Sequence, residues 1–433
     1  MGACLRVRCG RRSPNVVRGS PNATARVWRP RVGRPLLVLV VGTWVLSAGL
    51  HAAEQVVSPG ESIGAKVQNL RPGDALLVRK GVYNESITIS GLKGIQAAPI
   101  VIKGEPGAEI ALARGQDGIL FYGGGGSAWV IVDGLKITGA RRAGILISGS
   151  HHITIRNCIS GNNGRWGIQS TLSDYLTVEN CELFGSRREH GVYFSTTEHP
   201  VARNNKIHDN AGCGIHMNGD RREGGDGIIT GGLLEKNVIY NCGLRRGGAA
   251  INMDGVEKTL VRNNLIYNNG AGGITVFHGD GLRSGTGNEF CNNTLYFQPG
   301  KGRFGLQLFH GAKDTTVRNN IFIGGRGPAL EIDQASLAGL KSDCNIFFQQ
   351  GGGQPVELGG QRMTLDVWKQ KTSQDAHSTS AEPKFVNLAG GDFHLAGGSP
   401  GIDKGAAVKD VTDDLTGKKR PSGGPCDIGA YEK

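Results

Sequence analysis

The sequence has no hydrophobic run long enough to cross a membrane as a helix. Its longest apolar stretch, Leu36–Leu50, has 15 residues, whereas a membrane-spanning helix needs about 20. Acidic residues are also missing from the first 53 positions, which contain nine Arg and end in Ala52-Ala53. A basic segment, a short apolar core and small residues, in this order, are typical of a secretory signal. We therefore expect residues 1–53 to be a signal peptide or an N-terminal anchor. The protein should be exported (periplasm, cell surface or secreted), with no stable membrane span after signal removal.

Cysteine pairs with the spacing of zinc ligands are missing too. Residues 54–433 contain seven cysteines, an odd number, and no two of them are separated as in zinc sites. The same part of the chain has little excess charge, because the formal net charge of +12 falls to +3 without the nine Arg of residues 1–53. The basic balance therefore gives no argument for nucleic-acid binding.

A short phrase that begins with Gly or Ala recurs eight times between Gly144 and Asp333. It occupies residues 144–148, 167–171, 191–195, 214–218, 250–254, 273–277, 305–309 and 329–333. The starts are 23 or 24 residues apart, except for two intervals of 36 and 32 residues. Within each phrase apolar and polar residues alternate, which predicts a strand with one buried face. A fixed period of about 23 residues is typical of a stacked-repeat architecture.

A second phrase follows about 14 residues after each start, and in most units it ends in Asn. In register, the column consists of Asn205, Asn237, Asn264, Asn293, Asn320 and Asn345. Asn tolerates left-handed backbone and forms local hydrogen bonds, so we expect these side chains to form a ladder at one corner of the stack. Cys158 and Cys181 occupy the same column in two earlier units. We expect them to be neighbours and to pack as free thiols, with a disulfide between them as the alternative.

Units this short, with two or three strands and an Asn corner, resemble the coils of the right-handed parallel β-helix proteins of the pectate-lyase-like superfamily. Residues 62–86, with an expected helix over 62–70 and a strand over 75–79, and residues 98–104 are similar to the N-terminal part of chondroitinase-B-type and alginate-lyase β-helices. The segments 398–403 and 426–432 look like the tail of many exported bacterial β-helix proteins.

The resemblance implies an all-β fold, a right-handed single-stranded parallel β-helix with a cap at each end. We place the N-terminal cap and first coils at 54–115, the coils at 116–348 and the C-terminal cap at 349–433. The C-terminal cap should contain a short helix over 364–371 and a strand that wraps back along the coils. No linker or composition shift separates these parts, so we expect one elongated domain and a monomer.

Because all coils share one register, outward side chains form columns with neighbours about 4.8 Å apart. The third position of the phrase gives Leu146, Gln169, Tyr193, His216, Asn252, Thr275, Gln307 and Glu331. The fifth position gives Ser148, Thr171, Ser195, Asn218, Asp254, Phe277, Phe309 and Asp333. The middle units therefore offer hydrogen-bonding groups along one strip of the surface.

Basic residues border this predicted strip on both sides. Before the strands lie Arg142, Arg165, Arg187, Arg188, Arg245, Arg246, Lys301 and Arg303. After the strands, two insertions at 219–232 and 279–288 bring Arg221, Arg222 and Arg283. Clustered positive charge on a nearly neutral chain favours an anionic ligand, and Arg suits carboxylates because of its planar fork of donors. The strip therefore predicts a groove for an anionic polymer, although charged loops are also common at solvated edges.

An anionic polymer along stacked rungs is the substrate geometry of the polysaccharide lyases and epimerases of this superfamily. The resemblance therefore implies β-elimination on an acidic, uronate-containing polysaccharide. This reaction needs a base, a proton donor and a cation on the carboxylate. We predict His216 as the base and Tyr193 as the acid, with His190 beside them. The cation would be Arg188, Arg222 or a calcium ion held by Asp254 and Asp280.

Further side chains along the strip are predicted to contact the substrate. They are Gln169, Asn218, Asn252, Arg165, Arg222, Arg246, His278 and His310. No catalytic motif of a lyase, epimerase or polygalacturonase has matching spacing. Glu189-His190-Gly191 resembles the Gly-His-Gly of polygalacturonases, but their paired aspartates are missing from the neighbouring units.

The missing aspartates weaken a hydrolase interpretation, unless Asp226, Asp254 and Asp280 converge through the loops. Because a fold alone does not determine a function, other hypotheses stay open. They are a non-catalytic glycan-binding or cell-surface protein, and a glycoside hydrolase or epimerase on the same scaffold.

Overall fold

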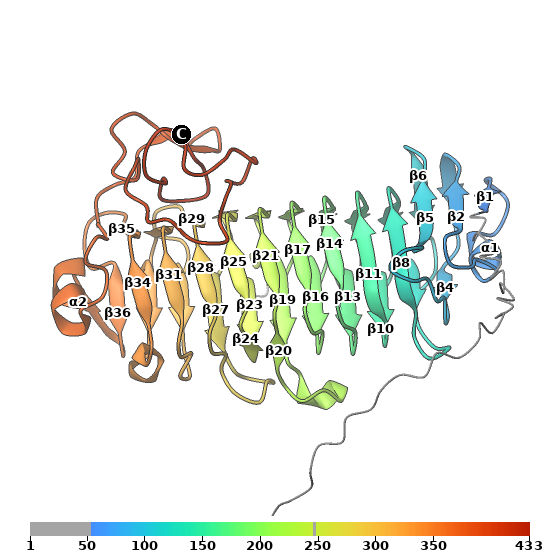
Figure 1. Cartoon of the computed structure of the whole chain (residues 1–433), viewed down its shortest axis with the longest axis horizontal. Coiled ribbons are helices and arrows are strands. Elements are labelled where there is room, and N and C mark those ends of the chain that lie inside the picture. Colours follow the sequence, from blue (N-terminus) through green and yellow to red (C-terminus); the bar gives the residue numbers. More distant parts are fainter. Residues whose placement is uncertain (1–52, 246–247) are drawn as a thin grey trace, which may run out of the picture. The chain divides into compact units, whose positions relative to one another are not determined.

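The computed structural model describes residues 53–245 and 248–433, which belong to one structural unit, Leu50–Lys433. The predicted signal or anchor segment lies outside the described residues, apart from Ala53. Three parallel sheets of 12, 11 and 12 strands run through the stack of coils (Figure 1). Each regular coil gives one strand to each sheet, so neighbouring strands of a sheet come from successive coils. The all-β parallel β-helix predicted from the repeat is confirmed.

The strands are short. Sheet A contains β1 (Glu54–Val57), β2 (Ala75–Val78), β5 (Ile100–Gly104), β8 (Ala128–Asp133), β11 (His151–Arg156), β14 (Thr177–Glu179), β17 (Val201–Arg203), β21 (Leu233–Glu235), β25 (Leu260–Arg262), β28 (Glu289–Cys291), β31 (Thr316–Arg318) and β34 (Lys341–Asp343). Sheet B contains β3 (Gly81–Tyr83), β6 (Ala108–Ala111), β9 (Lys136–Thr138), β12 (Ile159–Gly161), β15 (Glu182–Phe184), β18 (Lys206–His208), β22 (Val238–Tyr240), β26 (Leu265–Tyr267), β29 (Thr294–Tyr296), β32 (Ile321–Gly324) and β35 (Ile346–Gln349).

Sheet C follows sheet B in each coil and carries the recurring phrase. It contains β4 (Ile87–Ile89), β7 (Ile119–Phe121), β10 (Ala143–Ser148), β13 (Trp166–Thr171), β16 (Val192–Ser195), β19 (Ile215–Asn218), β23 (Ala249–Asp254), β27 (Gly272–Phe277), β30 (Leu306–Leu308), β33 (Leu330–Ile332), β36 (Val356–Leu358) and β37 (Gln361–Met363). Two small pairs, β20 (Ile229–Thr230) with β24 (Val256–Glu257) and β38 (Phe385–Asn387) with β39 (Asp392–Leu395), complete the strands.

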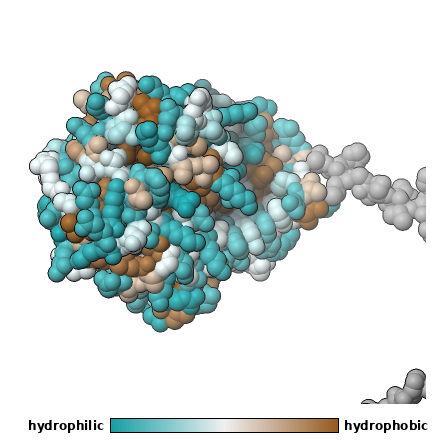
Figure 2. Space-filling model, turned by 60° about the vertical axis from the view of Figure 1, so that its left-hand side comes forward, coloured by the Kyte–Doolittle hydropathy of each residue, from teal (hydrophilic) through white to brown (hydrophobic). Residues whose placement is uncertain are grey.

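The core is a column of aliphatic side chains inside the coils. Alternate strand residues point inward, as in Ile168, Val192 and Ile215 of sheet C, which have no exposed area. Period-two alternation thus buries one face of each strand. On the face shown in Figure 2, hydrophilic residues predominate and hydrophobic ones lie in small separate groups. No helix in the described part of the chain is long and apolar enough to span a bilayer.

A short helix lies at each end of the stack, as predicted. Helix α1 (Ile63–Val67) begins after Ser62, whose side chain accepts the Ala65 N–H, and it buries Ile63 and Val67. Helix α2 (Leu365–Thr372) begins after Thr364. Its Trp368 is fully buried and donates Nε1–H to Asp375 at 2.8 Å. Both helices therefore bring apolar side chains over coil ends that no further coil covers. Two single-turn 3-10 helices, η1 (Arg221–Glu223) and η2 (Gln334–Leu337), lie after strands of sheet C.

The predicted asparagine ladder is present at the corner between sheets A and B. Asn264 Nδ2 donates to Asn293 Oδ1 at 2.9 Å, and Asn264 Oδ1 accepts the backbone N–H and the side-chain amide of Asn237, both at 3.0 Å. The same pattern joins Asn205 to Asn237 and Asn320 to Asn345. All members of this ladder are buried. A second set of buried asparagines, Asn163, Asn210 and Asn269, supports the corner between sheets B and C and was not predicted.

Replacing Asn264 by Leu should destabilise the fold. The change would leave the Leu234 carbonyl, which accepts from Asn264 Nδ2 at 2.9 Å, and the Asn237 N–H buried without partners. We expect a loss of about 1–3 kcal/mol in the free energy of unfolding, measured by urea titration and circular dichroism. Gln361→Leu, at an exposed position of β37, is the matched control. An unchanged midpoint for Asn264→Leu would contradict the stabilising role of the ladder.

The cysteines of the described residues are all free and buried. Cys158 and Cys181 pack as neighbouring thiols, as predicted, and the contact with Cys158 together with burial raises the pKa of Cys181 well above its usual value. The disulfide considered as an alternative does not form between them.

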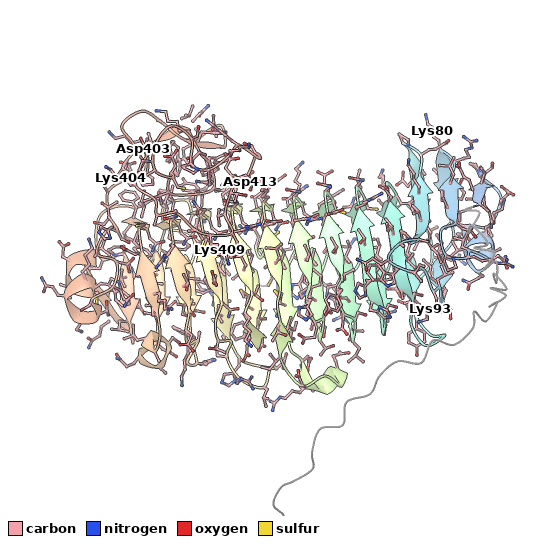
Figure 3. All side chains as sticks on the ribbon, in the orientation of Figure 1. Lys80, Lys93, Asp403, Lys404, Lys409 and Asp413 are labelled. Atoms are coloured by element: carbon pink, nitrogen blue, oxygen red, sulfur yellow. The ribbon has the colours of Figure 1, made fainter. Side chains whose placement is uncertain are left out.

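The C-terminal tail returns along the coils, but not as a strand. Asn319 donates to Ala406 O at 2.7 Å, Asn263 donates to Asp413 O at 2.8 Å, and Lys236 pairs with Asp413 at 2.6 Å. Figure 3 labels Asp403, Lys404 and Asp413 in this tail, beside the stack. Residues 396–433, all of them described, contain no strand. The physical reason is that the tail binds the side chains of corner residues, which offer no continuous row of backbone groups.

Candidate functional site

Sheet C aligns the predicted columns in the predicted register. We call the first of them the rung column: Leu146, Gln169, Tyr193, His216, Asn252, Thr275, Gln307 and Glu331. Successive members are direct partners in neighbouring strands. In the second column, Ser195, Asn218 and Asp254 are at most 3% exposed. Only the rung column therefore presents a row of polar side chains that a ligand can reach.

Three aromatic rings of the predicted site lie together, and we call them the ring cluster: His190, Tyr193 and His216. The ring centroids are 4.7 Å apart for His190 and His216, 5.2 Å for Tyr193 and His216, and 5.4 Å for His190 and Tyr193. Tyr193 and His216 stand on β16 and β19, whereas His190 precedes β16. The ring cluster brings together three of the four side chains predicted to be catalytic.

The hydrogen bonds of the ring cluster fix the position of its protons. The Cys213 backbone N–H donates to His190 Nδ1 at 3.0 Å, so this nitrogen carries a lone pair. In the neutral ring the proton is then on His190 Nε2, which lies 3.0 Å from His216 Nδ1. His216 Nδ1 accepts that proton, and its own proton is on Nε2. His216 therefore presents an N–H, not a lone pair, to any ligand on the strip.

The His216 N–H has no acceptor. Nε2 is buried and has no hydrogen-bond partner among the described residues. Burial lowers the pKa of His216 to about 4, in spite of the nearby carboxylates of Asp254 and Asp280. Burial likewise lowers the pKa of His190 well below its usual value. Both rings are therefore neutral at pH 7, and the geometry favours a donor role for His216. The base role predicted from sequence stays a prediction.

Other buried polar atoms without partners surround the ring cluster. They are Trp166 Nε1, Gln169 Oε1, Ser195 Oγ and Asn218 Oδ1. Buried polar groups are normally hydrogen-bonded, so a group of unpaired donors and acceptors on neighbouring strands suits a ligand rich in hydroxyl groups. Both kinds of atom are present, which matches a sugar better than a purely anionic group.

Tyr193 has the features of a proton donor. Its ring stacks on Trp166 at 5.9 Å, and Arg165 covers the other aromatic surface of Trp166 at 4.1 Å. Asn218 Nδ2 donates to the Tyr193 hydroxyl oxygen at 3.1 Å. Burial raises the pKa of Tyr193, more than its hydrogen bonds with Ser195 and Asn218 lower it. The hydroxyl is therefore protonated at neutral pH.

The carboxylates predicted to hold calcium are engaged with the protein. Asp254 accepts the backbone N–H groups of Gly279, Asp280 and Gly281 at 2.8–3.0 Å, and Asp280 pairs with Arg222 at 2.8 Å. A calcium ion would have to displace these contacts, and its binding here stays a prediction. Asp226 accepts the N–H of Ile228 in its own turn, so it does not join them.

Two groups of three side chains in the described residues lie close enough to hold a metal ion, His190–Cys213–His216 and Asp343–Cys344–His377. Neither is a calcium site, because calcium prefers oxygen ligands. In the first group His190 Nε2 carries a proton, and burial raises the pKa of the Cys213 thiol. A metal would therefore have to displace protons from both residues.

The predicted cations are spread along the strip. Arg188 is exposed. Arg165 approaches Glu189 at 3.4 Å, and Arg222 is bound between Asp220 and Asp280. Arg246 lies outside the described residues. His278 and His310 pack on each other with centroids 4.9 Å apart, both exposed, in the segments that follow β27 and β30. The structure therefore does not bring these two histidines to the ring cluster.

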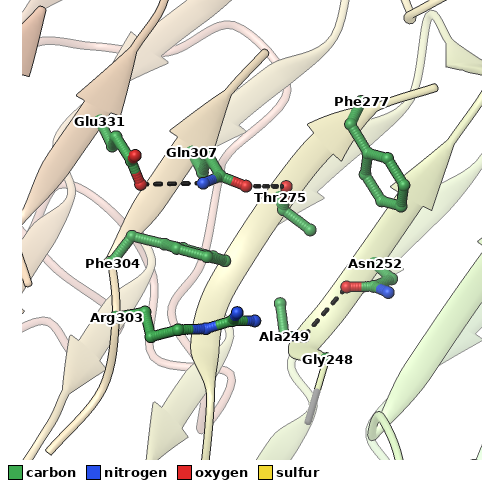
Figure 4. A pocket seen from close by; sticks show the side chains of 9 residues that line it. All are labelled: Gly248, Ala249, Asn252, Thr275, Phe277, Arg303, Phe304, Gln307 and Glu331. Carbon is green, nitrogen blue, oxygen red and sulfur yellow. Dashed lines mark hydrogen bonds between the residues drawn. The ribbon is translucent and has the colours of Figure 1, made fainter. Parts of the chain in front are cut away.

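A hollow of about 370 Å³ lies farther along the rung column, and we call it the Arg303 pocket. Its lining, drawn in Figure 4, consists of Gly248, Ala249, Asn252, Thr275, Phe277, Arg303, Phe304, Gln307 and Glu331. Arg303 and Phe304 precede β30, and their side chains extend toward Ala249 of β23. The pocket therefore combines a cation, a carboxyl group, amides and aromatic rings.

A chain of hydrogen bonds orients the polar side chains of the Arg303 pocket. Thr275 Oγ1 donates to Gln307 Oε1, and Gln307 Nε2 donates to Glu331 Oε2, both at 2.8 Å. Burial raises the pKa of Glu331, and the neighbouring Glu357 carboxylate adds to the rise, whereas Gln307 and Arg303 lower it. A carboxyl group with a raised pKa beside an arginine is typical of reaction centres.

The sequence contains both signals of this pocket but does not rank them. Glu331 ends the rung column, and Arg303 belongs to the basic residues before the strands. Neither was predicted as a site residue, because the hollow depends on how Phe304 and Gly248 lie. Phe304 is 5% exposed, and a side chain at Gly248 would meet the Cys213 sulfur at 2.7 Å.

The sequence matches the family model of the right-handed β-helix region over residues 109–225 and 222–366. The match spans more than half of the chain, and the protein belongs to this family. The only relative reported among curated proteins at this level, the Bacillus subtilis (strain 168) protein YwoF, is 26% identical over 146 residues. This alignment covers 32% of the chain and 31% of YwoF, so the chain matches about a third of that relative's length.

Several solved structures share the fold. The chain is similar to pectate lyase Pel9A, with a TM-score of 0.60 and 16% identity over 89% of this chain and 98% of that one. It is similar to an alginate lyase from Paenibacillus sp. str. FPU-7, with a TM-score of 0.53 and 17% identity over 70% and 99%. A mannuronic-acid-specific polysaccharide family 6 lyase from human gut microbiota gives 0.51 and 16% over 70% and 82%. At these identities the likeness establishes a pectate-lyase-like parallel β-helix and nothing about activity.

Proposed function

We propose that the protein binds an acidic, uronate-containing polysaccharide along the rung column and cleaves it by β-elimination in the Arg303 pocket. One observation carries the proposal: a single hollow on the polar strip contains both an arginine and a carboxyl group whose pKa is raised. These are the cation and the base that the reaction requires. The solved lyases with this fold act, by their names, on pectate, alginate or mannuronic acid polymers, which is consistent with such a substrate.

The proposed reaction begins with binding of a uronate carboxylate to the Arg303 guanidinium. Neutralising that carboxylate acidifies the proton on the adjacent ring carbon, and the Glu331 carboxylate removes it. The electron pair forms a double bond to the next ring carbon as the bond from that carbon to the glycosidic oxygen breaks. Protonated Glu331 then returns the proton to the leaving oxygen. The products are a chain with a free hydroxyl and a chain with an unsaturated end.

The ring cluster would bind a neighbouring sugar of the same polymer. Its His216 N–H and the unpaired atoms of Gln169 and Asn218 match hydroxyl and ring oxygens, and Tyr193 is a protonated donor. Export, supported by the predicted signal, would place the protein where polysaccharides are found. The alternative centre, with His216 as base, Tyr193 as acid and Arg188 on the carboxylate, is distinguished by the variants below.

Incubation of residues 54–433 with polygalacturonate, alginate, chondroitin sulfate and neutral dextran tests the function. We expect the ultraviolet absorbance of a conjugated double bond to rise with one of the acidic polymers and not with dextran. Incorporation of deuterium from D₂O into polymer without double bonds would instead identify an epimerase. Retention of an acidic polymer without any chemical change would identify a binding protein.

A hydrolase is the second candidate, because Glu331 and Glu357 are direct partners in β33 and β36. Retaining glycosidases use two carboxyl groups about 5–5.5 Å apart. Glu357, however, pairs with Arg362 at 3.2 Å and does not line the pocket. New reducing ends without ultraviolet absorbance, lost in both Glu331→Gln and Glu357→Gln, would favour hydrolysis over β-elimination.

Replacement of His216 by Ala separates its two possible roles. If His216 binds a sugar through its N–H, we expect kcat/KM to fall about 10-fold, chiefly through a higher KM. Rates measured over a range of polymer concentrations give both parameters. Loss of all product formation at saturating polymer would show instead that His216 is the base, as predicted from the sequence.

A further inference from the structure

The turns that lead from sheet B to sheet C enclose a second groove, outside the rung column. Three hollows of about 340, 380 and 550 Å³ follow one another along these turns. The first two share Asn241 and Leu244, and the last two share Asn268 and Gln298. We call the continuous depression the corner groove. It extends over six turns, from Asn162 to Gln298, which corresponds to about 24 Å at ~4.8 Å for each step.

The unequal lengths of these turns create the groove. The turns 185–191, 241–248 and 297–305 are long, whereas 209–214 and 268–271 between them are shorter. The long turns stand as walls and the short ones form the floor. Leu244, at the ridge between the first two hollows, is 63% exposed.

The walls of the corner groove carry positive charge. Arg187, Arg245 and Lys301 come from the three long turns, line the first two hollows and are exposed. One acidic residue, Asp209, lines the first hollow. Its carboxylate is held by His208 at 2.6 Å and by Asn241 Nδ2 at 3.2 Å, not by these cations. The groove therefore favours an anionic ligand.

The floor and the far end supply groups for sugar rings. Asn162, Asn241 and Asn268 form a column in left-handed backbone conformation. Asn268 lines two of the hollows, and its buried Oδ1 has no partner in the described residues. The third hollow is lined by Tyr267, Tyr296 and Phe393. Flat aromatic rings suit the apolar faces of pyranose sugars, and amides suit their hydroxyl groups.

We propose that the corner groove is a second binding site for an acidic glycan chain, separate from the Arg303 pocket. Its cations would bind the carboxylate or sulfate groups, its asparagines the hydroxyl groups and its aromatic end a sugar ring. The site depends on the ligand being an anionic glycan, not on cleavage in the Arg303 pocket. Two sites on one polymer raise the apparent affinity, because binding at the second becomes intramolecular.

Electrophoresis of residues 54–433 through gels that contain polygalacturonate, alginate or chondroitin sulfate tests the groove, with dextran as the neutral polymer. The variant Arg187→Ala/Arg245→Ala/Lys301→Ala removes its cations. The variant Lys80→Ala/Lys103→Ala/Lys341→Ala removes the same charge from exposed positions elsewhere and is the control. We expect the groove variant to raise the apparent Kd for an acidic polymer roughly 5- to 50-fold relative to the control, and less in ~0.5 M salt.

Arg303→Ala keeps this proposal distinct from the proposed function. Retardation that survives in Arg303→Ala and disappears when the groove substitutions are added supports the corner groove, even if no polymer is cleaved. Equal Kd values for the groove and control variants, or complete loss of retardation in Arg303→Ala alone, would overturn it. Wild-type protein that no polymer retards would overturn both proposals. Thermal midpoints equal to that of the wild type show that the variants are folded.

Discussion

Glu331→Gln should lower the rate of unsaturated-product formation at least about 100-fold. Gln keeps the shape of the side chain and the contact with Gln307, but it cannot accept a proton from the substrate. Wild-type kcat/KM should rise with pH through a pKa above 4.5, because burial raises the pKa of Glu331, and this acid limb should vanish with the carboxyl group. Initial rates across pH, read as ultraviolet absorbance, measure both effects. Glu289→Gln, at an exposed position of sheet A, is the matched control.

The same substitution should leave the fold as stable as, or more stable than, the wild type at neutral pH. Because the pKa of Glu331 is higher in the folded than in the unfolded chain, the folded state binds the proton more tightly. Its contribution to stability is therefore fully present below the unfolded pKa and is lost as pH rises through the folded pKa. Gln has no charge and avoids that loss. A lower thermal midpoint together with lost activity would show damage to the fold, not removal of a base.

Arg303→Ala should lower kcat/KM by about 100- to 1,000-fold, the second-largest effect that we expect. Without the guanidinium, the uronate carboxylate keeps its full charge and the adjacent proton stays weakly acidic. Arg303→Lys should recover part of the loss, because Lys restores the charge but not the planar pair of donors. Rates at several polymer concentrations and two salt concentrations measure the effect.

Lys103→Ala, an exposed change on β5 of sheet A, is the control for Arg303→Ala. Normal rates in Arg303→Ala, together with loss of activity in Arg188→Ala, would place the reacting carboxylate at the ring cluster. The centre predicted from the sequence would then be the correct one.

Most of the fold could be predicted because it is written in a period. The alternation in each phrase placed Tyr193, His216 and Asn252 on neighbouring strands, and sheet C confirms that register. The asparagine column was predictable because Asn recurs at one position. The second ladder was missed because Asn163, Asn210 and Asn269 alternate with Ser186 and Cys242, so the column has no single residue type. The path of the tail was anticipated, but its irregular form was not, because it depends on contacts with corner side chains.

The site was less predictable, because burial and protonation depend on three-dimensional neighbours. The sequence shows that Asp254 is in a column, but not that an insertion folds back to donate three backbone N–H groups to it. It shows His190 and His216, but not the Cys213 N–H that fixes their protons. Glu331 and Arg303 are 28 residues apart in the sequence, and only the packing of Phe304 and Gly248 makes them parts of one hollow.

The most direct test of the proposed site is the crystal structure of Glu331→Gln with a bound acidic oligosaccharide from whichever polymer the wild type cleaves. We expect the sugar chain along the rung column, one carboxylate on the Arg303 guanidinium, and the proton next to that carboxylate facing the side chain at 331. A neighbouring sugar should accept the His216 N–H. An oligosaccharide whose carboxylate lies at Arg188, with the reacting carbon beside His216, would contradict the assignment.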